Sequence, residues 1–271
     1  MKKFIFCLAA LTVFSGISGS LFEENQVFAE ASKQGSGHIS FTGDRDGNGN
    51  EGIRDPEYPD TIVDPGPSPS TTGDLRIDFV PQLNFSVNKI TNKEMSYPVN
   101  AQLFHDETPA RGNFIQVTDE RTEAFGWKLE LRQVNQFQNA AAANSQLTGA
   151  MLSFDKSWAN STEDLTHAPL VSKEVIEINN IGETYTLATA QSGNGLGTWS
   201  ISFGASENNP LQLENTLSPR QNQKGEAMLD PTFANKQIYE NSAITLNIPA
   251  ATKINSGTYS TVLTWILSEL P

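Results

Sequence analysis

The feature of this sequence that most constrains its fold is a two-residue alternation of apolar and polar side chains. In 125–132 the odd positions are Phe, Trp, Leu and Leu, whereas the even positions are Gly, Lys, Glu and Arg. A β-strand sends successive side chains to opposite faces, so this segment has one apolar face and one polar face. Segments 197–203 and 259–267 repeat the scheme, each with a tryptophan among the apolar positions. The alternation predicts three strands that each bury one face. In 259–267 the opposite face carries Val262 and Ile266, so we expect both faces of that strand to be partly covered.

Shorter runs of the same kind extend through the rest of the chain after residue 74. They are 75–79, 114–117, 151–154, 184–187 and 244–248, separated by glycine, proline and asparagine. Such runs are typical of antiparallel sheets. We therefore predict that 74–271 is an all-β domain, an antiparallel β-sandwich or a barrel-like fold. Two interruptions are expected, namely a short helix or irregular excursion at 139–146 and a long surface loop at 208–235.

The first 29 residues have the layout of a secretory signal peptide. Lys2 and Lys3 precede an apolar run at 4–13, and Ala29 supplies the small residue that a signal peptidase needs. The apolar run is too short to span a bilayer, which takes about 20 helical residues. We expect export with cleavage after Ala29, and cleavage near Gly19 is the alternative.

Residues 30–73 differ in composition from the rest of the mature chain. They are rich in Gly, Pro, Asp and Ser and poor in apolar residues. A segment of this kind buries too little apolar surface to fold alone. The composition predicts an acidic linker that is mostly extended or disordered and that acts as a spacer.

Charge and cysteine content exclude several classes of function. The formal net charge is -13 at pH 7, which disfavours nucleic acid and anionic lipid as partners because both require a cationic surface. The single cysteine, Cys7, lies inside the signal peptide, so the mature chain has no thiol for disulfides, metal ligation or catalysis. No second long apolar run occurs. We expect no transmembrane segment in the mature chain, and any attachment to a cell wall to be non-covalent.

The sequence contains little that indicates a catalytic or cofactor site. The chain has three histidines, His38, His105 and His167, and no Gly-x-Ser-x-Gly or His-Glu-x-x-His motif. We predict that the protein is not an enzyme and that it carries no cofactor and no metal. One pattern keeps a calcium alternative open: 44–49 resembles the start of a calcium loop, and Asp55 stands where the last ligand would lie. An acidic flexible linker is the interpretation that the composition favours.

Two of the alternating strands carry a Trp-x-Leu motif, Trp127-Lys128-Leu129 and Trp265-Ile266-Leu267. With the residues around them, 126–131 and 259–271, they resemble the proximal and distal motifs of the WxL domain family. The resemblance covers about 75–271. It implies a surface protein of low-GC Gram-positive bacteria that attaches non-covalently to the cell wall through peptidoglycan.

The resemblance makes Trp127, Leu129, Trp265 and Leu267 candidate wall-binding residues. The alternation favours a different role, because a tryptophan and a leucine two positions apart fill one face of a strand and point into a core. An alternative function is an adhesin or scaffold subunit that binds partner surface proteins or host extracellular matrix. A wall-lytic enzyme is a third and weaker hypothesis.

Overall fold

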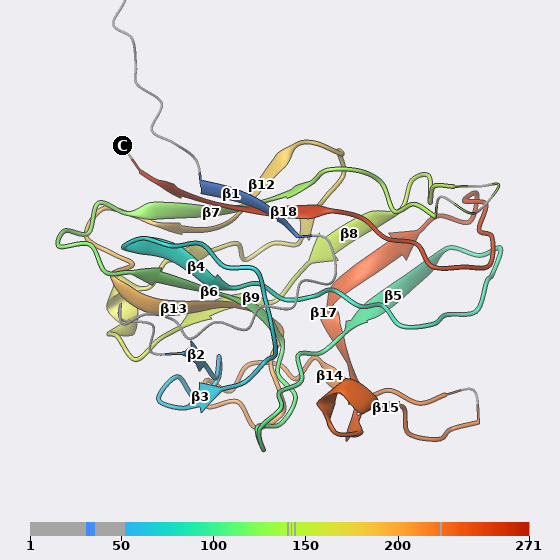
Figure 1. Ribbon diagram of the computed structural model, residues 1–271, viewed down its shortest axis with the longest axis horizontal. Helices are drawn as coiled ribbons and strands as arrows, with labels where there is room; N and C mark the ends of the chain where they lie inside the picture. The colour runs from blue at the N-terminus through green and yellow to red at the C-terminus, as the bar shows by residue number, and fades with distance from the viewer. Residues whose placement is uncertain are drawn as a thin grey trace, which may run out of the picture.

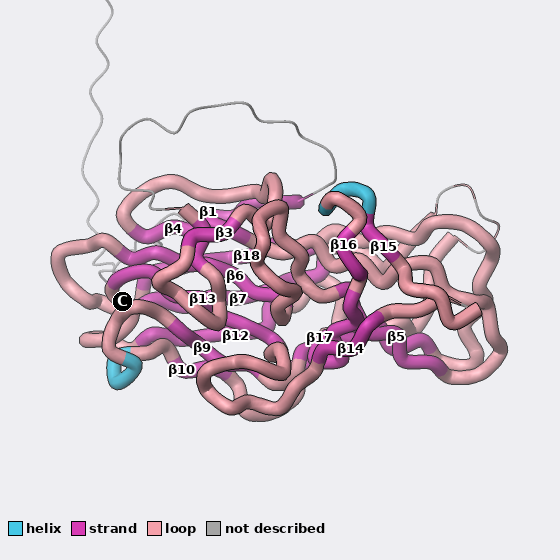
Figure 2. The backbone as a smooth tube through the Cα atoms, turned by 90° about the horizontal axis from the view of Figure 1, so that it is seen from below, coloured by secondary structure: helices cyan, strands magenta, loops and turns pink. Residues whose placement is uncertain are grey.

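The computed structural model describes residues 31–35, 52–139, 141, 143, 145–222 and 224–270, with the backbone alone for 31–35. The all-β prediction is confirmed: strands in antiparallel pairs make up the fold, and Figure 2 shows helix only in two short turns. These turns are the 3-10 helices η1 (Leu165–His167) and η2 (Pro231–Phe233). The strands are β1 (Ala31–Gly35), β2 (Ile53–Arg54), β3 (Ile62–Val63), β4 (Leu75–Phe79), β5 (Met95–Asn100), β6 (Asn113–Asp119), β7 (Trp127–Gln133), β8 (Met151–Phe154), β9 (Ser157–Asn160), β10 (Leu170–Val171), β11 (Ile176–Glu177), β12 (Thr184–Ala190), β13 (Gly197–Phe203), β14 (Leu217–Pro219), β15 (Leu229–Asp230), β16 (Lys236–Gln237), β17 (Tyr239–Ile248) and β18 (Leu263–Glu269).

The first sheet has the strand order β1-β18-β7-β12-β10 and forms the upper layer in Figure 1. Its strand β7 alternates between buried and partly buried residues along its whole length, as the sequence predicts. Strand β18 departs from that pattern, because Thr264 and Ile266 on its other face are buried as well. Strand β1 pairs with β18 at the edge of this sheet.

The second sheet, β4-β6-β13-β9, lies beneath the first (Figure 1). Strand β10 of the first sheet contacts β9 of the second, and β18 contacts β4, so the two sheets approach each other at both edges. Apolar side chains from both inner faces form one core, with Trp127 from the first sheet and Trp199 from the second among its largest members. This is the layered packing of a β-sandwich.

The third sheet extends the molecule along its long axis, on the right of Figure 1. Its order is β11-β8-β17-β14, and β5 pairs with the other side of β17. Leu152 of β8 and Ile244 of β17 join the same core as the sandwich. The predicted loop at 208–235 is less simple than expected, because it contains β14, β15 and η2 and buries Thr216 and Arg220.

Residues 52–73 come from the segment that we expected to be an extended linker, and they are packed against the second sheet. The hairpin β2–β3 lies over the outer face of β6, where the Arg54 amide donates to Oε1 of Gln116 at 2.8 Å and Gln116 Nε2 donates to the Gly52 carbonyl at 3.1 Å. A small second core there contains Val63 and Phe114. Composition missed this packing because the segment has few large apolar residues, and because its buried Asp55 and Glu57 have partners, Arg111 and Ser206, that are distant in sequence. The predicted boundaries at 29 and 73 stay predictions.

Candidate functional site

The two Trp-x-Leu motifs lie side by side in the first sheet. Strands β7 and β18 are antiparallel neighbours, and their register places Leu129 opposite Leu267 and Leu131 opposite Trp265. Directly opposite residues in an antiparallel pair share one face of the sheet. The fold therefore joins the two motifs into a single row of apolar side chains, although they are far apart in the sequence.

This row faces the core. Trp127 and Leu129 are 0% exposed, Trp265 is 7% exposed and Leu267 is 5% exposed. All four belong to the main apolar cluster. The indole nitrogen of Trp127 donates to the Gly195 carbonyl at 3.0 Å, so its polar group is also satisfied inside the protein. A polymer that reached the protein from solvent would meet almost none of this surface.

Trp199 provides a comparison, because it lies outside both motifs. It is 0% exposed, sits on β13 of the facing sheet and donates its indole hydrogen to the Leu196 carbonyl at 2.8 Å. The motif tryptophans and Trp199 thus have the same kind of environment.

One member of the predicted apolar row is not buried. Phe125 is 47% exposed, because Gly126 has a φ of 91° and β7 begins only at Trp127. A Cβ at position 126 would lie 2.5 Å from the Ala190 carbonyl oxygen, so glycine is required there. Phe125 instead lies under the guanidinium of Arg121, 5.8 Å from its ring centroid.

Of the three histidines, the structure describes His105 and His167. His38 lies outside the described residues. His105 stacks on Phe233 with 4.6 Å between the ring centroids, and His167 lies 3.2 Å from the side-chain oxygen of Asn194. Neither of these two is hydrogen-bonded to a serine within the described part of the chain. Among the same residues there is no group of three or more His, Cys, Asp or Glu side chains placed to hold a metal ion.

Asp55, the last residue of the possible calcium loop, belongs to a buried ion cluster. Its two carboxylate oxygens accept hydrogen bonds from Nε and Nη2 of Arg111 at 2.9 and 2.8 Å, and Arg111 also lies 3.1 Å from Glu57. Glu57 in turn accepts from the amide and hydroxyl of Ser206, both at 2.6 Å. The bonds to Asp55 and the charges of Asp55 and Glu57 outweigh the opposing effect of burial and raise the pKa of Arg111. Both oxygens of the Asp55 carboxylate are thus hydrogen-bonded to Arg111. Residues 44–49, the rest of the possible calcium loop, lie outside the described residues.

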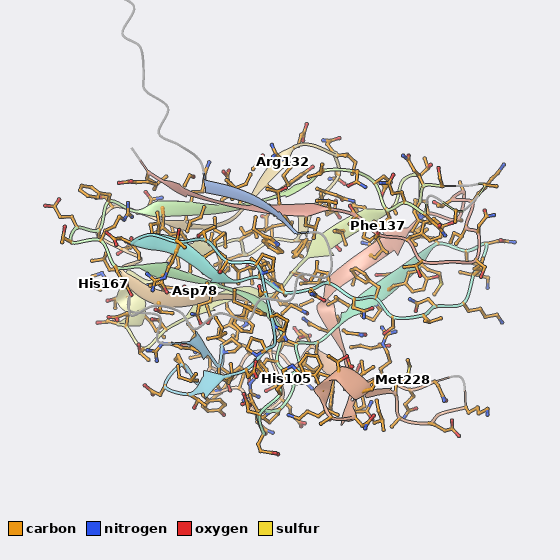
Figure 3. All side chains as sticks on the ribbon, in the orientation of Figure 1. Asp78, His105, Arg132, Phe137, His167 and Met228 are labelled. Carbon is orange, nitrogen blue, oxygen red and sulfur yellow. The ribbon has the colours of Figure 1, made fainter. Side chains whose placement is uncertain are left out.

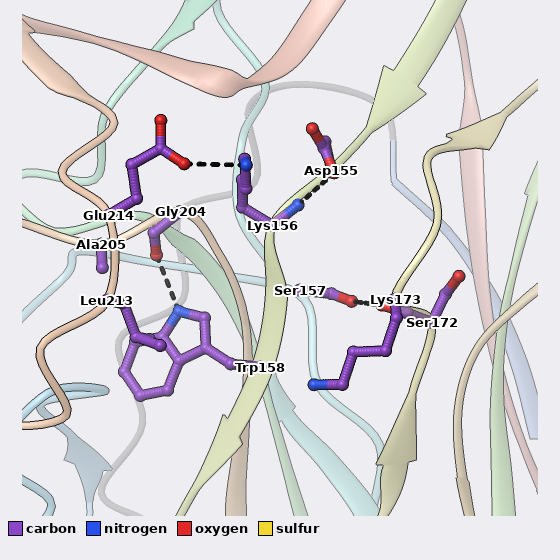
Figure 4. Close-up of a pocket in the computed structure, with 10 residues that line it drawn as sticks. All are labelled: Asp155, Lys156, Ser157, Trp158, Ser172, Lys173, Gly204, Ala205, Leu213 and Glu214. Atoms are coloured by element: carbon purple, nitrogen blue, oxygen red, sulfur yellow. Dashed lines mark hydrogen bonds and ion pairs between the residues drawn. The ribbon is translucent and has the colours of Figure 1, made fainter.

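A pocket of about 250 Å³ opens between β9 and the loops next to it (Figure 4). Four segments distant in sequence meet there: the β8–β9 turn with the start of β9, the loop after β10, the end of β13 and the loop before β14. They contribute Asp155, Lys156, Ser157, Trp158, Ser172, Lys173, Gly204, Ala205, Leu213 and Glu214. No local pattern in the sequence marks these residues, because they converge only in the fold.

The pocket has an apolar floor and a charged rim. Trp158 is 6% exposed and donates its indole hydrogen to the Gly204 carbonyl at 2.9 Å. On the rim, Lys156 forms a 2.8 Å ion pair with Glu214, and this contact lowers the pKa of the Glu214 carboxyl and raises that of Lys156. The ammonium of Lys173 points across the pocket toward β9 (Figure 4) and forms no ion pair among the described residues. The rim therefore offers a free cation beside an ion pair.

Within the described ranges no helix has the length and apolar character needed to cross a membrane. No curated protein and no solved structure matches the chain significantly. A family model does match, over residues 25–271, and its description is WxL domain, surface cell wall-binding. The match covers nearly the whole chain and confirms the resemblance that the two motifs carry, so this protein belongs to the WxL family of surface cell wall-binding domains.

Proposed function

We propose that the mature protein, after cleavage of 1–29, is a non-catalytic surface protein held non-covalently on the cell wall by its binding to peptidoglycan. Membership in a wall-binding family supports the location. The observation that carries the finer proposal is the pocket beside Trp158, with its apolar floor and the free cation on its charged rim.

The chemistry of the pocket fits one repeating unit of such a polymer. Ligand sites combine an apolar surface with a few polar groups that fix orientation. Here Trp158 and Leu213 provide the apolar surface, and Lys173 and Glu214 provide opposite charges on the rim. Peptidoglycan presents sugar rings together with the carboxylates of its peptides. A volume of about 250 Å³ suits a single ring or a short peptide end.

In this proposal the Trp-x-Leu motifs support the site without touching the ligand. Trp127 and Trp265 hold the first sheet onto the core, because their side chains face inward. Their loss would then abolish wall binding by unfolding the domain.

The test is a pull-down on purified peptidoglycan that has been freed of other wall polymers. Wild-type protein should sediment with it and be released by denaturant. The Lys173→Glu variant should bind about 10- to 100-fold more weakly, the range expected for a lost charge-assisted hydrogen bond of about 1.5–3 kcal/mol. The matched control is Lys224→Glu, which changes an exposed lysine in a different loop and should bind normally. Equal binding by wild type and Lys173→Glu would contradict the pocket assignment.

The non-catalytic part of the proposal needs its own measurement. The pure protein should leave the turbidity of a cell-wall suspension unchanged over hours. Clearing of the suspension would revive the enzyme hypothesis.

A second function, an adhesin or scaffold subunit, is favoured by a separate observation. Phe125, Leu165 and Leu196 are 47%, 45% and 37% exposed and lie on three loops at the end of the molecule where Figure 3 labels His167. The loops that carry them meet there, since the Gly193 amide donates to the Ala124 carbonyl and the Gly195 amide donates to the His167 carbonyl. Exposed apolar clusters often mark protein contacts. Co-purification of a stable protein complex with no affinity for bare peptidoglycan would favour this function.

A further inference from the structure

The long axis of the molecule ends in two loop clusters of opposite charge. At the right-hand end of Figure 1, the loops that precede β5, precede β8 and follow β17 lie together. The register places Met95 opposite Ile248, Thr252 donates its hydroxyl hydrogen to the Thr148 carbonyl at 2.8 Å, and Phe85 packs edge-on against Phe137. We call residues 84–94 and 249–258 of this cluster the basic end.

Charge on the basic end opposes that of the protein as a whole. Its charged residues are Lys89, Lys93, Glu94 and Lys253, all of them exposed, in a chain whose formal net charge is -13. The opposite end of the molecule, where His167 is labelled in Figure 3, is formed by 119–126, 161–168 and 191–196. Those three loops hold five acidic residues and one arginine. The molecule is therefore electrically polar along its axis.

The three lysines of the basic end are unpaired. None of them forms an ion pair with any residue that the structure describes, whereas Lys128, Lys156 and four arginines do so elsewhere. Hydroxyl and amide side chains lie on the same loops. The exposed ones include Asn84, Asn88, Asn92, Ser256 and Thr258. This combination can bind anionic groups and hydrogen-bond to neighbouring hydroxyls.

A membrane surface fits the basic end poorly. Interfacial membrane anchors rely on exposed aromatic and large aliphatic side chains. Phe85, the aromatic residue of the basic end, is half-buried against the core. Val87 and Ile90 are 93% and 46% exposed, but no exposed aromatic side chain accompanies them within 84–94 and 249–258, and the exposed polar residues Asn88, Lys89 and Asn92 separate and flank them.

We propose that the basic end binds an anionic, hydroxyl-rich phosphodiester polymer of the cell wall, as a second contact separate from the pocket. The lysines would replace counterions along the phosphates, and the amides and hydroxyls would bond to the polyol units between them. The same polymer would repel the acidic end. The protein would therefore bind through its basic end, with the acidic end pointing away from the polymer. This proposal rests on the proposed location at the wall but not on peptidoglycan recognition.

The experiment measures binding of the mature protein to purified poly(glycerol phosphate) at several salt concentrations. Release of counterions by three lysines predicts a slope of log affinity against log salt of about -2 to -3, which is roughly a 20- to 60-fold loss between 50 and 200 mM. The variant Lys89→Gln/Lys93→Gln/Lys253→Gln should lose that slope and most of the low-salt affinity. The matched control, Lys128→Gln/Arg132→Gln/Lys224→Gln, changes the net charge equally and should bind like wild type.

Three outcomes would overturn the proposal. They are no binding of wild type at low salt, an equal loss in the control variant, and lysine-dependent binding to vesicles with anionic lipid but not to the polymer. Failure of the proposed function looks different: wild type would then fail to bind peptidoglycan stripped with hydrofluoric acid while still binding poly(glycerol phosphate). Failure of the present inference alone would leave binding to stripped peptidoglycan intact and dependent on Lys173.

Discussion

The strands that carry the family motifs and the loops that carry the unpaired charges are built in opposite ways. In β7 and β18 the motif side chains are 0–7% exposed and belong to one apolar core. In the pocket rim and the basic end, Lys173, Lys89 and Lys253 are exposed and have no ion-pair partner among the described residues. The motif side chains are therefore placed to stabilise the sheet, whereas the groups with free binding capacity lie on loops outside the motifs.

The largest expected effect tests the structural half of this comparison. Trp127→Ala and Trp199→Ala should each lower the free energy of unfolding by about 4 kcal/mol, because each leaves a large cavity in the core. Urea unfolding followed by circular dichroism measures both. Since Trp199 lies outside the motifs, equal losses mean that burial and not motif membership determines the role of the tryptophan. A stable Trp127→Ala domain that no longer bound wall material would break the comparison.

The next effect tests whether the packed part of 30–73 belongs to the folded unit. Arg111→Met should cost about 3 kcal/mol, since it leaves the carboxylates of Asp55 and Glu57 buried without their cation. Thermal unfolding measures the loss. The control is Arg132→Met, on the polar face of β7, where no buried carboxylate depends on the guanidinium. A stability of Arg111→Met close to that of wild type would mean that 52–73 can detach at little cost.

The smallest effect concerns the acidic end. The bidentate contact with Arg76 lowers the pKa of Glu120 below its ordinary value of 4.5. A lowered folded pKa stabilises the protein above the unfolded value, and this contribution disappears as the pH falls from about 4.5 through the folded pKa. Glu120 is 44% exposed in its side chain, so the effect should stay below about 1 kcal/mol.

Denaturant unfolding of Glu120→Gln between pH 3 and 7 measures this contribution. The variant should be less stable than wild type at pH 7, and the difference should shrink as the pH falls below about 4.5. Glu123→Gln, an exposed neighbour that forms no ion pair among the described residues, is the control. A difference that stayed constant as the pH fell would show that the contact does not act through the charge of Glu120.

The fold class, the family and the direction of the motif side chains could be predicted from the sequence. The prediction for Phe125 was wrong, because the alternation was extended two positions too far and the positive φ of Gly126 was not foreseen. Neither the pocket nor the buried ion cluster could be predicted. The cluster joins residues that are far apart in the chain, and no local sequence pattern indicates that Asp55, Glu57, Arg111 and Ser206 are partners.

The alternation of apolar and polar residues is enough to predict amphipathic strands with inward-pointing tryptophans at 127, 199 and 265, because side-chain direction along a strand follows from local backbone geometry. Three features become visible only in the folded chain: the two motifs are neighbours in register, residues 52–73 cover a sheet, and opposite charges collect at opposite ends. Those outcomes depend on which distant segments bury surface and pair charges together, and this is settled by the packing of the whole chain rather than by any local pattern.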